Sequence, residues 1–310
     1  MLAEAPGLLA ARGFDRFALL TTERAAAAEP GLVDAADVVL HVPAGPVPEA
    51  AASVRSGVEG RPLVAYGGGR VIDATKALGG ADGLAVAAIP TTLSGAEMTR
   101  FHRMPAGVDE WNLVRPSVVV AQPDLMNSQP MPGLAASAMN ALAHAIEALY
   151  TPLSNPVAED AALRAVTHIA LGLTIGTRTL ALGAVLAGYA SGSAGFAVHH
   201  AACQTIVRVL GTPHAPTNAV MLPHFVRMME SRAARQMELV AAALGNTGVP
   251  PSDTVAALAA QAEVVRLSEL GVEPAQIGFV VEATLQHPAL ANTPDPPGAD
   301  ELTEVLERAL

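Results

Sequence analysis

The chain has 310 residues, of which 51% are hydrophobic, so it is long enough to bury one large core or two smaller ones. Its formal net charge of −11 disfavours binding to nucleic acid, because an acidic surface repels phosphate backbones. Aromatic residues make up only 3% of the sequence, which favours a helix-rich fold with small aliphatic packing over an all-β sandwich.

The only cysteine is Cys203, so no disulfide can form within the chain. The opening segment MLAEAPGLLAARG lacks the basic region and the long apolar run of a secretory signal. These two features predict a cytoplasmic protein.

The first part of the chain alternates short β-type runs with Ala-rich helical runs. This alternation predicts a parallel sheet with helical crossovers, of the Rossmann-like α/β class. Ligands of such sheets bind beyond the carboxyl ends of the strands. The five predicted strands cover residues 16–22, 37–43, 62–69, 84–92 and 117–123.

Three glycines directly follow the third predicted strand, in AYGGGRVIDATKAL at 65–78. Gly67, Gly68 and Gly69 let the backbone approach a ligand, and the start of the following helix presents N–H groups and a partial positive charge to a phosphate. A tight structural turn has the same composition, so at this point the two interpretations are equally supported.

Lys76 is the single lysine among the 18 basic residues of the chain. A sequence that otherwise uses arginine has kept a compact ammonium one or two turns into this helix, which favours a role that a guanidinium does not fill. Chance retention is the alternative.

Hydroxyl side chains follow the next predicted strand, in IPTTLSGAEMT at 89–99. Thr91, Thr92 and Ser94 suit hydrogen bonding to a phosphate or a ribose, although structural turns share this composition. Because parallel strands end at the same edge of the sheet, the two loops together predict a nucleotide cradle.

After PMPG at 130–133 the strand pattern ends, and the chain reads as successive helices separated by breaks rich in Pro and Gly. We therefore predict an α/β domain over residues 1–132 and an all-α domain over residues 133–310, with a site in the cleft between them.

No charged residue lies between Arg178 and Arg208, a stretch long enough to span a bilayer. Its Gly and Ser residues and its two adjacent histidines instead predict one or two buried core helices that line a pocket, without membrane association.

Asn140 and His144 lie one helical turn apart in the apolar segment NALAHAIEALY at 140–150. On the helix alone, a buried structural pair is the favoured explanation. His200, in an apolar helix, and His214, in the break GTPHAP, add two imidazoles. Three imidazoles and one amide form a ligand set that divalent iron or zinc accepts. The histidines that we predict to be core residues are His168, His199 and His224.

Together these motifs resemble the iron-containing alcohol dehydrogenase family. GGGRVIDATK is similar to the family's GGGSxxDxxK element. IPTTLSGAEMT, NALAHAIEALY, and HHAACQ followed by TPHAPTNAVMLPH resemble its other signatures in order and spacing, from about Arg12 to the C-terminus. The threonine loop, the asparagine and the HHxxC sequence look most like maleylacetate reductases.

The resemblance implies an NAD(P)H-dependent oxidoreductase with a small-molecule substrate. It further implies a homodimer formed through the α/β domain, and a divalent iron or zinc ion held by one Asp and three His. The implied metal ligands fall on Asn140, His144, His200 and His214, of which the three histidines also take the catalytic role. The implied cofactor contacts fall on Gly67, Gly68, Gly69, Arg70, Asp73, Lys76, Thr91, Thr92 and Ser94.

The sequence departs from the family pattern at this site. Asn140 replaces the Asp ligand, which predicts weak or absent metal binding, although maleylacetate reductases share the asparagine. Arg70 replaces the serine that follows the three glycines. Gln204 stands where a histidine is expected near the nicotinamide, and an amide does not relay a proton.

Two functions are consistent with these features. The favoured one is a reductase in which NAD(P)H delivers a hydride to an activated C=C or C=O bond, while Arg70, Arg100 or Arg208 pairs with a substrate carboxylate. The alternative is a redox-inactive family member that performs an acid/base rearrangement, or only binds a ligand, at the same site. Titration with NADH and NADPH separates the two.

Overall fold

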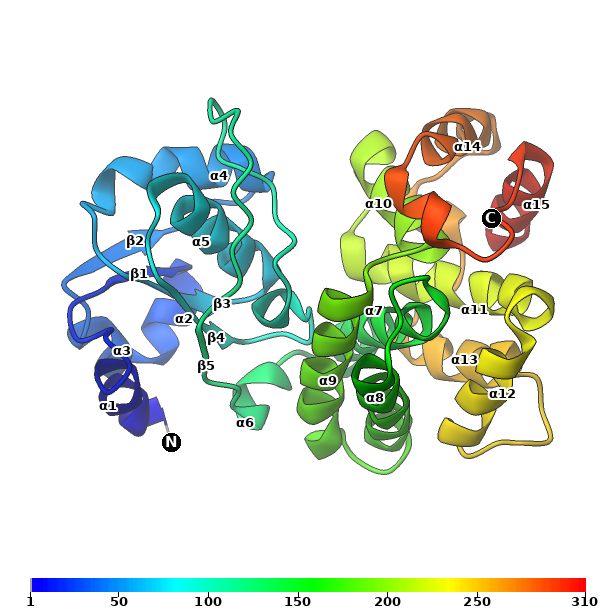
Figure 1. Ribbon diagram of the computed structural model, residues 1–310, viewed down its shortest axis with the longest axis horizontal. Helices are drawn as coiled ribbons and strands as arrows, with labels where there is room; N and C mark the ends of the chain where they lie inside the picture. Colours follow the sequence, from blue (N-terminus) through cyan, green and yellow to red (C-terminus); the bar gives the residue numbers. More distant parts are fainter. Residues whose placement is uncertain (1) are drawn as a thin grey trace. The chain divides into compact units, whose positions relative to one another are not determined.

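The computed structural model describes residues 2–310, and the chain divides into two compact units (Figure 1). The first unit ends at Ser128 and the second runs from Gln129 to Leu310. This division lies shortly before residue 132, where the sequence predicts the domain boundary.

The first unit contains a five-stranded parallel sheet with the strand order β2-β1-β3-β4-β5. β1 lies between β2 and β3, so the order of the strands reverses beside β1, and in open α/β sheets ligands bind at such a point. All five strands lie within the predicted ranges, which confirms the predicted parallel α/β class. The strands are β1 (Ala18–Thr21), β2 (Val38–His41), β3 (Leu63–Gly67), β4 (Val86–Pro90) and β5 (Val118–Val119).

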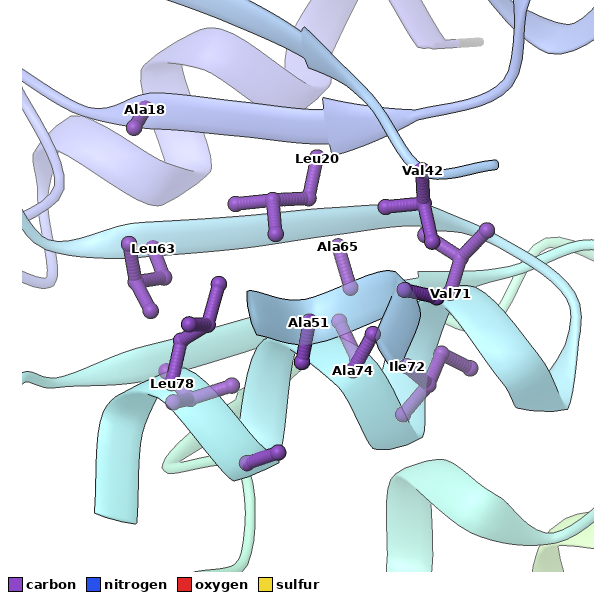
Figure 2. Close-up of a cluster of buried hydrophobic side chains, with 14 of the residues drawn as sticks. Ala18, Leu20, Val42, Ala51, Leu63, Ala65, Val71, Ile72, Ala74 and Leu78 are labelled. Atoms are coloured by element: carbon purple, nitrogen blue, oxygen red, sulfur yellow. The ribbon is translucent and has the colours of Figure 1, made fainter. Parts of the chain in front are cut away.

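Alternate residues of the central strands contribute to different apolar clusters, as the two-residue period of a strand requires. Leu20 and Ala65 belong to the cluster that contains α5 residues such as Ile72 (Figure 2). Leu19 and Tyr66 belong to a second cluster with residues near the N-terminus. Helices therefore cover both faces of the sheet. The helices of this unit are α1 (Ala5–Ala10), α2 (Glu23–Ala28), α3 (Pro30–Asp34), α4 (Val47–Val54), α5 (Gly69–Asp82) and α6 (Pro123–Met126).

The second unit is helical, and its described residues, 129–310, contain no strand. Its central helix is α7, in which every residue from Leu134 to Tyr150 is buried. A helix buried on all sides carries its polar side chains into the core, where each needs a partner or a function. The helices are α7 (Met131–Tyr150), α8 (Pro156–Thr174), α9 (Leu180–Ala194), α10 (Val198–Leu210), α11 (His214–Arg232), α12 (Ala234–Ala243), α13 (Pro251–Ala259), α14 (Ile277–Leu285) and α15 (Ala299–Ala309).

The uncharged stretch between Arg178 and Arg208 forms two helices. Among residues 2–310 no single helix is long and apolar enough to cross a membrane. The segments Thr177–Ala194 and Val198–Leu210 meet that test only as a pair, by length and composition, and they are bent by 100° where they join. Many of their side chains are buried in the helical unit, as the sequence predicts for core helices.

Candidate functional site

The turn between β3 and α5 leaves the start of α5 open. β3 ends at Gly67 and α5 begins at Gly69, with Gly68 in the capping position. Among the described residues no side chain caps this end of the helix, so the N–H groups of its first turn remain available to another acceptor. The start of a helix at the carboxyl end of a parallel sheet is suited to a phosphate group.

The second predicted loop lies against this turn. A Cβ atom on Gly68 would lie 2.9 Å from Thr92 Cγ2, and one on Gly69 would lie 3.0 Å from Ser94 Cβ. The backbone N–H of Thr91 donates to the carbonyl of Gly67 at 3.0 Å. The structure thus brings the two loops together, and the absence of side chains at the glycines is what allows the close approach.

Lys76 is fully buried, and its ammonium contacts protein atoms. It donates to the carbonyl oxygens of Ala96 at 2.9 Å, Thr99 at 3.2 Å and Phe101 at 2.8 Å. It also forms an ion pair of 2.8 Å with Asp73, one turn earlier on α5. Since residues 96–101 continue the Thr91–Ser94 loop, the ammonium fixes that loop to α5. Lys76 therefore has internal partners in three backbone carbonyl groups and the carboxylate of Asp73.

In the second unit, two of the predicted histidines meet in a stack of rings. The ring centroids of His144 on α7 and His200 on α10 are 4.5 Å apart, and Phe196 stacks on His200 at 4.6 Å. Nδ1 of His144, Nε2 of His200 and Oδ1 of Asn140 are buried, and none has a hydrogen-bond partner among the described residues. Three lone-pair donors from α7 and α10 are therefore left for a ligand.

His214 is the first residue of α11 and is exposed. Burial is the main cause that lowers the pKa of His144 and of His200 well below the ordinary value, and neighbouring histidines, His214 among them, lower both further. His144 and His200 are therefore neutral at physiological pH, the form in which an imidazole binds a metal ion.

The predicted metal ligands fit a metal ion only in part. Imidazole nitrogens and an amide oxygen are donors that iron or zinc accepts, and buried donors without partners are the kind that a ligand satisfies. Within residues 2–310, however, no three His, Cys, Asp or Glu side chains are arranged to hold a metal ion. The site thus offers suitable donors but not a complete set.

Glu147, on α7, is a site residue that the sequence analysis missed. Its carboxylate accepts a hydrogen bond from His200 Nδ1 at 2.6 Å. Its position in the sequence could have indicated this role. Glu147 lies three residues after His144 and seven after Asn140, a spacing that places all three side chains on one face of a helix. His199, a predicted core residue, is buried and hydrogen-bonds to Asn218 at 2.9 Å.

The three predicted arginines and Gln204 are not buried. Arg70, Arg100 and Arg208 are exposed, and Gln204 is half-buried.

A cavity of about 670 Å³ adjoins α11, α13 and α15, and no predicted metal ligand lines it. Its polar lining consists of His224, Arg227 and Arg308, and burial lowers the pKa of His224.

Comparison with known proteins agrees with the site motifs. Residues 134–310 match the model of the Fe-containing alcohol dehydrogenase family, C-terminal part. The chain is 37% identical over 226 residues to maleylacetate reductase 2 of Cupriavidus pinatubonensis, a match that covers 68% of this chain and 62% of the relative. It is 32% identical over 307 residues to the maleylacetate reductase of Pseudomonas knackmussii, covering 92% and 87% respectively.

The same family is found among solved structures. The maleylacetate reductase of Agrobacterium tumefaciens has a TM-score of 0.87 to this chain at 27% identity, over 99% of this chain and 93% of that one. The match to the Cupriavidus relative spans less than two thirds of that protein, whereas the Pseudomonas and Agrobacterium matches span most of theirs. The family-model match and the long Pseudomonas alignment confirm the resemblance, and the chain belongs to the iron-containing alcohol dehydrogenase family.

Proposed function

We propose that the chain is an NAD(P)H-dependent reductase of the maleylacetate reductase type. It reduces an activated C=C or C=O bond of a small, carboxylated substrate. The observation that carries the proposal is the uncapped start of α5, held beside Thr92 and Ser94 at the carboxyl end of the sheet. The relatives at 32–37% identity are named maleylacetate reductases, which supports a small carboxylated substrate.

The dinucleotide binds through backbone and hydroxyl groups. The N–H groups after Gly68 donate to the phosphate oxygens, with Arg70 beside them, and the hydroxyl groups of Thr91, Thr92 and Ser94 donate from the second loop. Lys76 and Asp73 act indirectly, because their contacts hold the loop that carries these hydroxyls.

The helical unit binds and orients the substrate. When bound, NAD(P)H supplies the hydride, and a divalent metal ion polarises the substrate oxygen. Asn140, His144, His200 and His214 are the residues that would hold this ion, and would hold it weakly because an amide replaces the usual carboxylate. Since His144 and His200 are neutral, each has a free nitrogen that can coordinate a metal ion or accept a hydrogen bond from a substrate hydroxyl group. The proton that accompanies the hydride therefore comes from another group or from water.

The substrate carboxylate pairs with an exposed guanidinium. Arg70, Arg100 and Arg208 are the candidates, because guanidinium binds a carboxylate through two parallel hydrogen bonds. Replacing each in turn by Met and measuring KM for maleylacetate identifies the one involved.

Binding of the cofactor tests the proposal most directly. We expect fluorescence titration to show micromolar affinity for NADH or NADPH, and maleylacetate to be reduced with loss of absorbance of the reduced cofactor. A chain that binds neither dinucleotide contradicts the proposal and favours the non-redox alternative, which the reductase relatives do not support.

A further inference from the structure

Glu147 is a buried carboxylate with several hydrogen-bond donors around it. Its side chain is 1% exposed. Oε2 accepts from His200 Nδ1 at 2.6 Å, and Oε1 accepts from the backbone N–H groups of His199 at 2.7 Å and His200 at 3.3 Å. The hydroxyl of Tyr150, one turn later on α7, also hydrogen-bonds to this carboxylate.

Two of these contacts cap a helix from outside it. α10 begins at Val198, and its own capping residue, Ala197, has no side chain that can accept a hydrogen bond. His199 and His200 are the second and third residues of α10, whose N–H groups lack partners within the helix. Glu147 therefore supplies to α10 the acceptor that an Asp or Ser would normally provide from the preceding position.

The contact between Glu147 and the imidazole of His200 determines which ring nitrogen of His200 carries a proton. In its ionised form the carboxylate of Glu147 offers only acceptors, so the contact at 2.6 Å then places the proton on Nδ1 and leaves a lone pair on Nε2. Nε2 is buried and has no hydrogen-bond partner among residues 2–310, and the ring stacks against both Phe196 and His144, whose own centroids are 5.6 Å apart. The carboxylate thus fixes the position, the orientation and the tautomer of His200 together.

We propose that Glu147 is a positioning residue: it caps the start of α10 and holds His200 as the Nδ1–H tautomer, so that Nε2 presents its lone pair to a substrate hydroxyl group or to a metal ion. This inference rests on the proposed function for its consequence in catalysis, but the tautomer itself can be measured without turnover. Outer contacts of this kind typically alter metal affinity or activity by roughly 10- to 100-fold.

Nitrogen spectroscopy of the imidazoles tests the tautomer. In two-bond ¹H–¹⁵N correlation spectra of the full chain, with His200 assigned by its loss in H200N, we expect the parent to show a protonated Nδ1 and an unprotonated Nε2. A parent that shows the proton on Nε2 overturns the proposal without any need for a variant.

Substitution of Glu147 tests its role as the cause. An amide has one acceptor and one donor group, so Glu147→Gln cannot accept from both His200 Nδ1 and the α10 backbone, and we expect Nε2–H to appear in its spectrum. The matched control is Glu230→Gln, since Glu230 also caps another helix, accepting from the N–H of Ser252 at 3.1 Å, but this contact involves no histidine. A folded E147Q chain with the His200 pattern of the parent contradicts the proposal.

Kinetics give an independent measurement. We expect E147Q to lower kcat with maleylacetate by roughly 10- to 100-fold, while the NADH dissociation constant stays within about twofold, because the dinucleotide loops belong to the first unit. E230Q should match the parent in both. Equal kcat values for E147Q and E230Q overturn the proposal, whereas a parent without turnover counts against the proposed function and leaves the decision to the spectra.

Discussion

Glu97 is a carboxyl group buried in the loop that Lys76 holds. Neither of its carboxylate oxygens has a hydrogen-bond partner in another described residue. Burial raises the pKa of Glu97 to about 7, against the effects of its own backbone N–H and of Lys76, which lower it; Asp73 raises it further. Ionisation of this group in the folded chain is therefore unfavourable, because the charge has little compensation.

The raised pKa predicts a stability that depends on pH. The folded chain keeps a proton on Glu97 up to about pH 7, whereas the unfolded chain loses it near 4.5. The contribution of protonated Glu97 to the free energy of unfolding is fully present below pH 4.5, the pKa in the unfolded chain. It is lost as the pH rises through about 7, the pKa in the folded chain, and the loss reaches about 3 kcal/mol. We expect Glu97→Gln to raise the free energy of unfolding at pH 8 and to change it little at pH 4, measured by urea denaturation.

The control for this effect is a carboxylate in the same unit that is exposed. Glu49, on α4, meets this condition. Glu49→Gln should not change the free energy of unfolding differently at the two pH values. An equal gain from E97Q at pH 4 and pH 8 would show that its effect comes from packing.

Lys76 offers a test between a direct and an indirect role in cofactor binding. Lys76→Met leaves three carbonyl groups and Asp73 without the ammonium, so we expect the free energy of unfolding to fall by about 3 kcal/mol and NADH affinity to fall by roughly tenfold or more. Arg103→Met, on an exposed residue just beyond the loop, is the control. If K76M keeps the stability of the parent but loses NADH binding, the ammonium contacts the cofactor directly.

Asn140 provides a test of metal binding. Its Oδ1 is buried and has no hydrogen-bond partner in the part of the chain that the structure describes, and a carboxylate at this position adds the negative charge that a divalent ion favours. We expect the purified parent to hold less than one metal ion per chain after dialysis against chelator, and Asn140→Asp to hold more, by elemental analysis. A full equivalent in the parent contradicts the prediction, and no increase in N140D shows that the four positions do not share one ion.

At the scale of elements, the close approach of Gly68 to Thr92 is one point of contact between the two loops that a substitution can alter. Gly68 has φ −81° and ψ −175°, a conformation open to alanine, so Gly68→Ala acts through the 2.9 Å approach to Thr92 Cγ2. We expect G68A to weaken NADH binding several-fold. Thr92→Ser, which removes Cγ2, should restore part of the affinity in the double variant and so reveal a favourable coupling.

Gly31→Ala is the matched control for this pair. A Cβ atom there meets nothing within 4 Å, and Gly31 lies on α3 of the same unit. It should leave NADH affinity unchanged. Additive effects of G68A and T92S would mean that the two loops do not act together on the cofactor.

The elements themselves follow closely from local sequence, whereas the site follows only in part. Buried apolar runs ending at Gly or Pro place β3 and β4, and the i, i+4 spacing predicts that Asn140 and His144 share a helix face. The partners of Lys76 and Glu147 depend on where residues 96–101 and the start of α10 pass in space. Local patterns carry no such information, so only the structure shows that Lys76 fixes the loop of residues 96–101 and that Glu147 contacts His200.

At the scale of the whole molecule, the first unit exposes apolar side chains that a monomer would leave in water. Trp111, the only tryptophan of the chain, is 66% exposed, and Leu113 nearby is 38% exposed. Aromatic side chains are enriched at protein interfaces, and most soluble oligomers are symmetric dimers. These residues are therefore candidates for the surface through which two copies associate.

We expect light scattering of the parent at micromolar concentration to give twice the mass of one chain. Trp111→Asp should shift the mass toward the monomer, because a charge at a buried interface loses its hydration. Ile175→Asp is the control, since Ile175 is 82% exposed but belongs to the helical unit. A monomeric parent contradicts the dimer, and a mass lowered by I175D but not by W111D would assign the association to the helical unit.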